Sequence, residues 1–240
     1  MNVTPPPLRC AVFGASGGIG AALAAALAET HEVHAGSRSG AALQSAKVHP
    51  FAFDLTDEAS IAAACTAIGR PLDLVIVATG RLTREGGNGP EKSYRALGAA
   101  GMAELFAINT IGPALIAKHT LPLLRRDGRA VFAALSARVG SISENRLGGW
   151  HAYRASKAAL NMLVKNLALE LVRTHPQALA VTLHPGTVDT ALSAPFQRGV
   201  APEKLFTPEM SAAALLTVLD GLTPAQSGGL FAWDGAGIPF

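Results

Sequence analysis

The sequence predicts an α/β fold, a doubly wound parallel sheet in a single domain. Short apolar runs alternate with alanine- and leucine-rich segments along the chain, as parallel strands and crossover helices do. The length of 240 residues suits one domain with one large core. Hydrophobic residues make up 49% and charged residues only 15%, which argues against disorder. We expect residues 8–240 to form this domain and residues 1–7, with three consecutive prolines, to form a short extended tail.

The first predicted strand and helix enclose a glycine-rich turn. Residues 8–13 are a short apolar run, and residues 19–27 are rich in alanine and leucine. Glycines between them permit a tight turn and let backbone N–H groups approach a pyrophosphate at the helix N-terminus. The alternative is an ordinary strand-to-helix turn, because a glycine pattern gains specificity only from its context. The residues assigned to the cofactor here are Gly14, Ser16, Gly17, Gly18, Ile19 and Gly20.

The second predicted strand, residues 32–37, ends without a carboxylate. In NAD-binding sheets an acidic residue usually ends this strand and holds the ribose 2′-hydroxyl. Here the end reads Gly36-Ser37-Arg38, and a guanidinium suits a 2′-phosphate. Ser37 and Arg38 therefore favour NADP(H) as the cofactor, with NAD(H) as the second candidate. The alternative for Arg38 is a solvated side chain in a loop.

The third and fourth predicted strands lead into further candidates for the cofactor site. Residues 48–53 form the third strand, and Asp54 after it is placed to meet an adenine amino group. Thr56 or Asp57 is suited to cap the next helix. Residues 72–78 are almost continuously apolar, as expected of a strand buried on both faces. The residues assigned to the cofactor at these two strand ends are Asp54, Leu55, Ala78, Thr79 and Gly80.

Asn109 lies inside a helix that we expect to begin at about Met102. The stretch before it, residues 81–101, is polar and glycine-rich, and its function is not readable. A buried asparagine in a helix interior competes with the backbone for hydrogen bonds and needs a reason. The reason is either a contact at a helix kink or a water site that serves catalysis.

The rest of the chain continues the alternation. We expect strands at residues 129–135, 178–183 and 230–232, and helices at 153–174 and 208–221. The segments 14–20, 36–38, 78–80, 136 and 184–190 all follow predicted strands. Because ligands bind outside the carboxyl ends of the strands in open α/β sheets, these five segments should meet at one edge.

Tyr153 and Lys157 lie four residues apart at the start of a predicted helix, so that both occupy one helical face. Free tyrosine has a pKa of roughly 10, and a nearby ammonium lowers this pKa by favouring the phenolate. Such a pair is suited to general acid–base catalysis. Taken alone, the pair is more often a surface tyrosine packed on a lysine stem. The glycine turn, Asn109 and Ser136 in the same chain favour the catalytic interpretation.

With these motifs the chain resembles the short-chain dehydrogenase/reductase family, whose fold is Rossmann-like, over nearly its whole length. The family's glycine motif is similar to residues 14–20, its Tyr-x-x-x-Lys to Tyr153 and Lys157, its structural asparagine to Asn109 and its Pro-Gly stretch to Pro185-Gly186. Within the family, the chain looks most like the C-factor and sniffer-like carbonyl reductases, on residues 138–142, 153–161 and 231–235.

The resemblance implies that NADPH reduces an aldehyde or ketone, so that the partner is a small-molecule carbonyl compound or alcohol. Tyr153 would give a proton to the carbonyl oxygen, and Lys157 would bind the nicotinamide ribose and lower the pKa of Tyr153. Asn109 would hold a water in the proton relay, and a serine would polarise the carbonyl. The implied catalytic set is Asn109, Ser136, Tyr153 and Lys157, and the implied cofactor contacts also include Asn109, Tyr153, Lys157, Pro185, Gly186, Val188 (through its backbone) and Thr190 (near the diphosphate).

The sequence departs from the family pattern at two places. The family's Asn-Asn-Ala-Gly after the fourth strand reads Val77-Ala78-Thr79-Gly80, which keeps the final glycine. The family's strand-ending Ser-Ser reads Ser136-Ala137, and the spacing to Tyr153 puts Ala137 at the place of the catalytic serine. Successive strand residues point to opposite faces, so Ser136 replaces this serine only if the strand end bends. Ser141 in the following loop is the alternative, and we take Ser136 as the candidate.

The predicted substrate pocket is mostly apolar, which suggests a hydrophobic carbonyl compound. Arg138 suits either a carboxylate on the substrate or plain solvent contact. His151 and His184 lie near the site, and each is more often a packing or loop histidine than a catalyst. The residues expected to line the pocket are Arg138, Val139, Trp150 and those of the loop over residues 191–206.

Two other functions fit parts of the pattern. A non-catalytic NADP(H)-binding protein in signalling or redox sensing would account for Ala137, but the intact Tyr153, Lys157 and Asn109 argue against it. The second alternative is an enzyme that works in the oxidative direction, or an epimerase-like relative. The short region after Thr190 leaves little room for a sugar-nucleotide domain, which disfavours the epimerase.

Charge and cysteine content narrow the partners, metal sites and cellular locations that we expect for this protein. The net charge is +3 and the basic residues are scattered, so no nucleic-acid partner is expected. Cys10 and Cys65 fall in apolar segments without metal-ligand spacing, which predicts buried thiols, no metal site and a reducing, cytoplasmic location. No secretory signal pattern is present and no apolar run approaches the roughly 20 residues of a membrane span, so no membrane partner is expected. Alanine-rich helices at 102–126 and 150–173 permit a homodimer or homotetramer.

Overall fold

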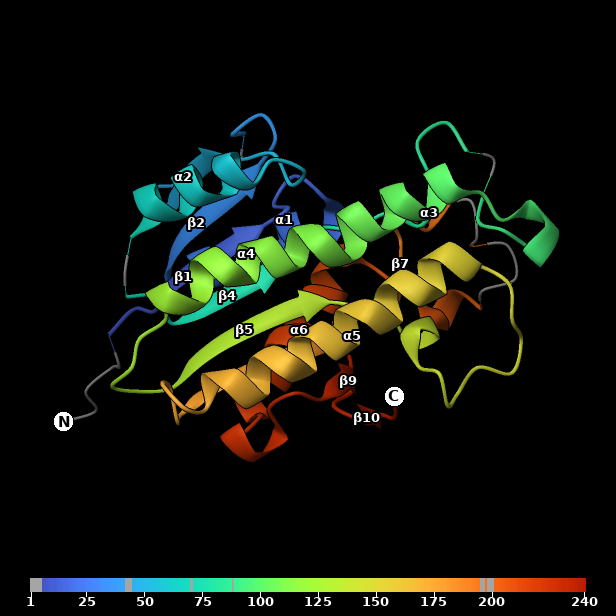
Figure 1. The fold of residues 1–240 in the computed structure, drawn as a ribbon. Coiled ribbons are helices and arrows are strands. Elements are labelled where there is room, and N and C mark those ends of the chain that lie inside the picture. The colour runs from blue at the N-terminus through green and yellow to red at the C-terminus, as the bar shows by residue number, and fades with distance from the viewer. Residues whose placement is uncertain (1–5, 42–44, 70, 88, 195–196, 198–200) are drawn as a thin grey trace.

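The computed structural model describes residues 6–41, 45–69, 71–87, 89–194, 197 and 201–240. Residues 1–5 of the predicted tail lie outside this part of the chain. Eight strands form one sheet in the order β10-β9-β6-β5-β4-β1-β2-β3, parallel throughout except between β9 and β10 (Figure 1). They are β1 (Arg9–Phe13), β2 (Glu32–Ser37), β3 (Val48–Ala52), β4 (Leu74–Val77), β5 (Ala130–Leu135), β6 (Ala178–His184), β9 (Leu230–Ala232) and β10 (Gly237–Ile238).

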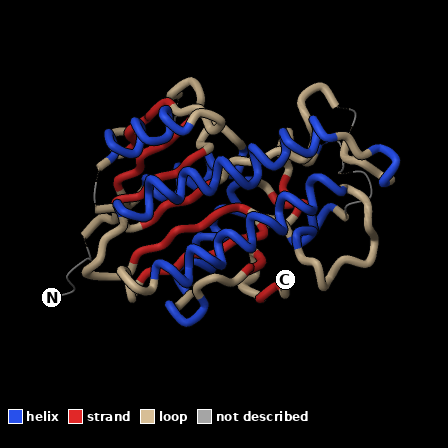
Figure 2. The backbone as a smooth tube through the Cα atoms, viewed as in Figure 1, coloured by secondary structure: helices blue, strands red, loops and turns tan. Residues whose placement is uncertain are grey.

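Helices cover both faces of the sheet, as the alternation in the sequence predicts. α1 (Gly18–Ala28) and α6 (Pro208–Gly221) pack against each other on one face. α2 (Glu58–Ile68), α4 (Gly112–Thr120) and α5 (His151–Leu171) cover the opposite face, and they lie in front of the sheet in Figures 1 and 2. Each face has its own buried hydrophobic cluster. The predicted doubly wound α/β fold is therefore confirmed.

The central strands are apolar along their whole length because both of their faces are covered. In β4, Leu74 and Ile76 join the cluster under α1 and α6, whereas Val75 and Val77 join the cluster under α2, α4 and α5. Side chains alternate between the faces of a strand, so a strand covered on both sides needs apolar residues at every position. Full burial of each such side chain contributes about 1.5–3 kcal/mol. The sheet is thereby held rigidly beneath the loops at its carboxyl edge.

One long helix runs through four elements without a break. α3 (Ala99–Phe106) continues through η2 (Ala107–Ile111), a π-helical turn, into α4 and η3 (Leu121–Leu123). This stretch of 25 residues contains an 18-residue window with a mean hydropathy of 1.4, and it is long and apolar enough to cross a membrane by length and composition. By that measure, the expectation that no segment approaches such a length is wrong. One such helix is weak support for a membrane segment, because helices that pack in a protein core pass the same test.

Local signals located most helix ends to within a few residues. Asp57 caps α2, as one of the two predicted alternatives, and its carboxylate accepts a hydrogen bond from Ala59 N at 2.9 Å. The helix expected from about Met102 begins at Ala99, and the helix expected from Tyr153 begins at His151. Differences of this size are normal at helix ends, where hydrogen bonding is incomplete.

Two short pairings were not predicted. β7 (Thr187–Val188) pairs in parallel with β8 (Leu205–Phe206) in a separate two-stranded sheet, and β10 extends β9 at the sheet edge. Strands of two residues are too short to have a recognisable period, so the sequence pattern does not reveal them. The described part of the chain also contains the 3₁₀ helices η1 (Tyr94–Ala96), η3, η4 (Arg138–Gly140), η6 (Pro202–Lys204) and η7 (Pro224–Gln226).

Candidate active site

The glycine turn after β1 forms an open helix N-terminus. Gly14 has a φ of 94°, in the left-handed region that favours glycine, and its N–H donates to Gly36 O at 2.9 Å. α1 then begins at Gly18 with no capping side chain and no acidic residue in its first turn. A Cβ atom at Gly18 would lie 2.7 Å from Thr190 Cγ2, so Thr190 packs against this helix end. The free N–H groups and the positive end of the helix suit a pyrophosphate.

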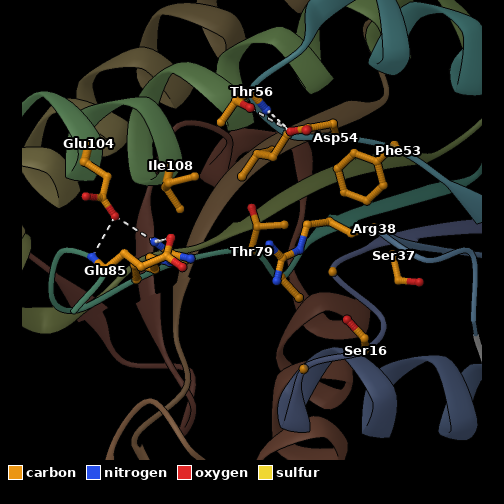
Figure 3. A pocket seen from close by; sticks show the side chains of 16 residues that line it. Ser16, Ser37, Arg38, Phe53, Asp54, Thr56, Thr79, Glu85, Glu104 and Ile108 are labelled. Carbon is orange, nitrogen blue, oxygen red and sulfur yellow. Dashed lines mark hydrogen bonds and ion pairs between the residues drawn. The ribbon is translucent and has the colours of Figure 1, made fainter.

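A first cavity, of about 460 Å³, opens beside this turn (Figure 3). Arg38 extends into it and forms no ion pair with any described residue. Ser37 is buried, and its hydroxyl donates to Ala41 O at 2.9 Å. An unpaired guanidinium at this place suits the 2′-phosphate of NADP(H). The residues predicted for the cofactor that line this cavity are Gly14, Ser16, Gly17, Ser37, Arg38, Asp54, Leu55, Ala78, Thr79 and Gly80.

Asp54 lies at the cavity wall as a carboxylate. Its Oδ1 accepts hydrogen bonds from Thr56 Oγ1 at 2.7 Å and from Thr56 N at 2.8 Å. These two bonds lower the pKa of Asp54, and the charge of Arg38 lowers it further. Asp54 is therefore ionised at neutral pH, and within the described residues its second oxygen accepts no hydrogen bond. That second oxygen is therefore available for the predicted contact to an adenine amino group.

Thr79 lines the same cavity. Its Oγ1 is buried and has no hydrogen-bond partner among the described residues. A buried polar group without a partner costs about 1–3 kcal/mol relative to a paired one. A dinucleotide that reaches this hydroxyl when it binds would remove this cost. The residues present therefore fit the cofactor that the sequence predicts.

The opposite wall of the first cavity comes from residues that the sequence did not indicate. Arg81 pairs with Glu104 at 2.6 Å and with Glu85 at 3.1 Å, and Ile108 lies beside them (Figure 3). Arg81 and Glu85 belong to the stretch whose function was not readable. The pairing of Arg81 with Glu104 spans 23 positions, and no local pattern connects residues so far apart.

Asn109 and Lys157 meet beneath Gly80. A Cβ atom at Gly80 would lie 3.4 Å from Asn109 Oδ1 and 3.5 Å from Lys157 Nζ. Asn109 is fully buried; its Nδ2 donates to Arg81 O at 2.8 Å and to Ser156 Oγ at 3.1 Å, and its Oδ1 accepts from Arg81 N at 2.8 Å. The amide thus ties the chain after β4 to the π-helical turn η2. This agrees with the predicted kink contact, and the water site stays a prediction.

Tyr153 and Lys157 share one face of α5, as their spacing predicts. Lys157 Nζ lies 5.9 Å from the centre of the Tyr153 ring and donates to Leu135 O at 2.8 Å. Burial lowers the pKa of Lys157 to about 8, which leaves it mostly charged at pH 7. Burial also raises the pKa of Tyr153 to about 12, because a phenolate would lose its hydration. The lowering expected for Tyr153 is therefore wrong, and at neutral pH its hydroxyl retains the proton that it would donate.

Neither candidate serine offers its hydroxyl proton to a substrate. Ser136 Oγ donates to Asn161 Oδ1 at 2.7 Å, and Ser141 Oγ donates to the carbonyl oxygen of Pro239. Ser136 lines the cavity that contains Tyr153, whereas Ser141 does not. Ala137, at the place of the family serine, presents only a methyl group there. The geometry therefore argues against the predicted carbonyl contact of Ser136, because Asn161 already receives its proton.

A second cavity, of about 310 Å³, opens beside Tyr153. The predicted pocket residues Arg138, Val139 and Trp150 line it, and so does Leu82, which the sequence did not indicate. From the predicted loop, Leu192 and Ser193 line the cavity, whereas residues 195–196 and 198–200 lie outside the described residues. Several other predicted site residues line this second cavity: Ile19, Ser136, Pro185, Gly186, Val188 and Thr190. Four predicted site residues line neither the first cavity nor the second: Gly18, Gly20, Asn109 and Lys157.

Trp150 lines both the second cavity and a neighbouring cavity of about 870 Å³. It has a φ of 50°, and no other non-glycine residue in the described part of the chain has a positive φ. Such a conformation costs about 1–3 kcal/mol and is retained mainly at functional sites. Its ring lies edge-on to that of Tyr153, with 6.4 Å between the centroids. Trp150 thus forms an aromatic wall next to Tyr153.

The two cysteines are not site residues. Cys10 and Cys65 are buried and unpaired, as predicted. Burial raises the pKa of Cys10 to about 12 and that of Cys65 to about 11, so neither forms the reactive thiolate at neutral pH. Among the described residues, no group of three or more His, Cys, Asp or Glu is placed to hold a metal ion.

Comparisons with known proteins agree with this geometry. The family model for short chain dehydrogenases matches residues 9–200. Among curated proteins, C-signal of Myxococcus xanthus is 38% identical over 142 residues, which cover 59% of this chain and 80% of that protein. The matches to two further curated oxidoreductases cover only 56% and 50% of their lengths, so the chain spans about half of each.

Solved structures match almost the whole chain. The NADPH-bound carbonyl reductase from chicken fatty liver is 25% identical with a TM-score of 0.80, and it covers 98% of this chain and 100% of its own. Carbonyl reductase Sniffer of D. melanogaster is 22% identical with a TM-score of 0.83 over the same shares, which shows a common fold. C-signal and Sniffer are both among the matches, as the predicted placement in the C-factor and sniffer-like branch requires. Since the family model covers most of the chain and its motifs meet at one sheet edge, the chain belongs to the short-chain dehydrogenase/reductase family.

Proposed function

We propose that this protein reduces an apolar aldehyde or ketone to an alcohol with NADPH, and that Tyr153 is the general acid. The observation that carries the proposal is the arrangement at Gly80 and Tyr153. Gly80 lines the first cavity with Asn109 and Lys157 directly beneath it, and Tyr153 on the same face of α5 lines the second cavity. A nucleotide held in the first cavity would thus face a substrate held in the second.

The residues suggest how the reaction proceeds. When bound, NADPH supplies the hydride that the carbonyl carbon receives. Tyr153 gives its proton to the carbonyl oxygen, so that the C=O group becomes CH–OH. Lys157 stabilises the negative charge left on the phenolate, because its buried ammonium lies close to the ring. Leu82, Val139 and Leu192 line the second cavity and favour an apolar substrate.

The preference for NADPH over NADH rests on Arg38. The guanidinium extends into the first cavity without an acidic partner, and no carboxylate ends β2. A carboxylate at that place would hold the 2′-hydroxyl of NADH and repel a 2′-phosphate. The carbonyl reductase from chicken fatty liver, a similar protein, has NADPH bound.

Purified protein mixed with NADPH and a panel of aldehydes, ketones and quinones tests the proposal. We expect loss of the reduced-nicotinamide absorbance with at least one apolar carbonyl compound, and slower loss with NADH. Binding of NADPH without turnover of any substrate would overturn the reductase proposal. Failure to bind either nucleotide would overturn the cofactor assignment as well.

A second candidate function is a non-catalytic NADP(H)-binding protein in signalling or redox sensing. Ala137 favours it, because this position gives the substrate cavity no hydroxyl, and the two nearby serines are already paired. The buried arrangement of Tyr153, Lys157 and Asn109 disfavours it, since nucleotide binding alone needs no proton donor. Turnover in the same assay separates the two functions.

Thr79→Val is expected to weaken NADPH binding by about 3- to 10-fold, because the buried hydroxyl loses a hydrogen bond of about 0.5–1.5 kcal/mol to the nucleotide. Isothermal titration with NADPH measures the change, and Thr79→Ser should bind nearly as well as the wild type. The same substitution at the exposed Thr217, on α6 and outside both cavities, is the control. Equal affinity of the Val and Ser variants would contradict a role of the Thr79 hydroxyl.

We also propose that two copies of the chain associate through α5, in a homodimer or homotetramer. Ala155, Met162 and Leu169 repeat at intervals of seven residues, and all three are exposed. Residues at this interval form one stripe along a helix. Ile111, on the adjacent long helix, is also exposed. An apolar stripe of this length on neighbouring helices is typical of a surface that another copy covers.

Leu169→Glu is expected to convert the assembly to monomers at micromolar concentration, because it places a charge within the apolar stripe, at its C-terminal end. Light scattering after size-exclusion chromatography measures the mass. Leu147→Glu is the matched control, since Leu147 is an exposed leucine on a loop outside α5. A wild-type protein that elutes as a monomer would overturn the proposed association.

We propose a cytoplasmic location, which the two buried free thiols support, because reducing compartments keep unpaired cysteines intact. Fractionation of cells that express the tagged protein tests this, and recovery with membranes would contradict it. That outcome would direct attention to the long helix formed by α3, η2 and α4.

A further inference from the structure

The cavity beside Tyr153 contains an imidazole that has no hydrogen bond to any described residue. His184 is the last residue of β6 and lines this cavity together with Tyr153 and Ala137. Its Nδ1 is buried without a partner. Buried polar atoms in folded proteins are almost always paired, so an imidazole without a partner at a cavity wall needs an explanation.

The sheet register places His184 level with Ser136, one residue before the position of the missing serine. β5 and β6 are neighbours, with Leu135 opposite Leu183, and Ser136 N donates to Leu183 O at 2.7 Å. Ala137 is the next residue, and both Ala137 and His184 line the second cavity. The chain thus has no hydroxyl at Ala137 but has an imidazole on the neighbouring strand at the same cavity.

Other donors around the cavity are less suited to a carbonyl oxygen. The hydroxyls of Ser136 and Ser193 already donate within the protein, to Asn161 Oδ1 and to Val188 O. Arg138 is about half exposed and pairs with Glu144 at 3.3 Å. Thr190 packs its methyl group against the start of α1, on the cofactor side. His184, which is half-buried, has neither a hydrogen bond nor an ion pair to any described residue.

His184 is neutral at physiological pH. Burial lowers its pKa to about 4; the charge of Arg138 lowers it as well, and the charge of Asp234 opposes this change more weakly. A neutral imidazole carries one N–H donor and retains its proton when it donates a hydrogen bond. It can therefore stabilise a developing oxyanion without competing with Tyr153 as the proton source.

We propose that His184 donates a hydrogen bond to the substrate carbonyl oxygen, in the role that the hydroxyl missing at Ala137 would otherwise fill. The inference rests on the proposed carbonyl reduction. No proton is transferred from the imidazole: Tyr153 supplies the proton, and His184 polarises and positions the carbonyl while the oxygen gains negative charge. His184 is then a catalytic residue that contacts the reacting oxygen from the wall of the cavity that it shares with Tyr153.

A double-mutant cycle between His184→Phe and Ala137→Ser tests the inference, with kcat and KM measured for the best substrate of the panel. His184→Phe should lower kcat/KM about 100-fold, mainly through kcat, as expected for the loss of one oxyanion donor. His184→Gln, which retains an N–H donor, should keep at least a tenth of the activity. Ala137→Ser should raise kcat/KM at least tenfold in the Phe background, and it should raise kcat/KM by a smaller factor in the wild type, where His184 already donates to the oxygen.

The dissociation constant for NADPH is the readout that separates this role from a structural one, and it should stay within about threefold in every variant. A kcat/KM equal to that of the wild type in His184→Phe would overturn the role of His184. An equal gain in kcat/KM from Ala137→Ser in the wild-type and Phe backgrounds would overturn it as well. If the His184 variants fail to bind NADPH, the test rests on Ala137→Ser in the otherwise wild-type protein. A gain in kcat/KM above tenfold in that variant would overturn the inference. Absence of turnover by the wild type would instead overturn the proposed function, and this role with it.

Discussion

Tyr153→Phe is expected to lower kcat/KM for carbonyl reduction by about 10³-fold, within the range of roughly 10²–10⁴ for loss of a general acid. Phenylalanine keeps the ring that packs edge-on against Trp150, with 6.4 Å between the centroids, but it has no proton to give. The alkoxide that forms on hydride transfer would then have to take its proton from water, which is not held in position as the Tyr153 hydroxyl is. Steady-state kinetics with NADPH and the best carbonyl substrate measure the loss.

The chain offers a matched control for this substitution, because its two tyrosines differ in environment. Tyr94 is 67% exposed, lies on η1 and contacts Arg95 rather than the cavity. Tyr94→Phe should therefore keep wild-type kinetics. Tyr153→Phe should also bind NADPH as the wild type does, since the phenolic hydroxyl donates to no described residue. More than a tenth of the activity remaining in Tyr153→Phe would refute its assignment as the proton donor.

The features that the sequence predicted well are those with a local cause. The glycine turn was predictable because Gly14 needs a positive φ and the following residues begin a helix. The buried strands were predictable because β4 and β5 are apolar at every position, as coverage of both faces requires. The pairing of Tyr153 with Lys157 follows from helical spacing alone. In each case, the residues that determine the structure lie within one or two elements.

The features that the sequence did not predict depend on contacts between distant elements. The orientation of Ser136 is set by Asn161, 25 residues further along, on the helix that covers the sheet. The pKa of Tyr153 depends on its burial under several elements, which a spacing of four residues does not reveal. From the sequence, His184 was expected to be a packing or loop histidine, and it becomes informative only because the fold brings it to the same cavity as Tyr153 and Ala137. Sequence patterns thus located the site, whereas the hydrogen bonds within it required the tertiary structure.

Arg38→Ala is expected to raise the dissociation constant for NADPH by about 30- to 100-fold and to change that for NADH less than threefold. A hydrogen bond to a charged group contributes about 1.5–3 kcal/mol, and a 2′-phosphate would lose one or two of them. NADH has a hydroxyl at this place, so it loses little. Titration with both nucleotides measures the two constants, and the effect on NADPH should shrink at high salt because the phosphate contact is electrostatic.

Arg95→Ala is the matched control for the loss of one positive charge, since Arg95 lies over the ring of Tyr94, outside the cavities described at the site. It should leave both constants unchanged, so that a general effect of net charge is separated from the contact at Arg38. Arg38→Asp extends the argument: the new carboxylate would repel a 2′-phosphate and accept a hydrogen bond from a 2′-hydroxyl, which should reverse the preference toward NADH. Equal losses for NADPH and NADH in Arg38→Ala would mean that Arg38 holds a part common to both nucleotides. The end of β2 would then have no bearing on the choice between them.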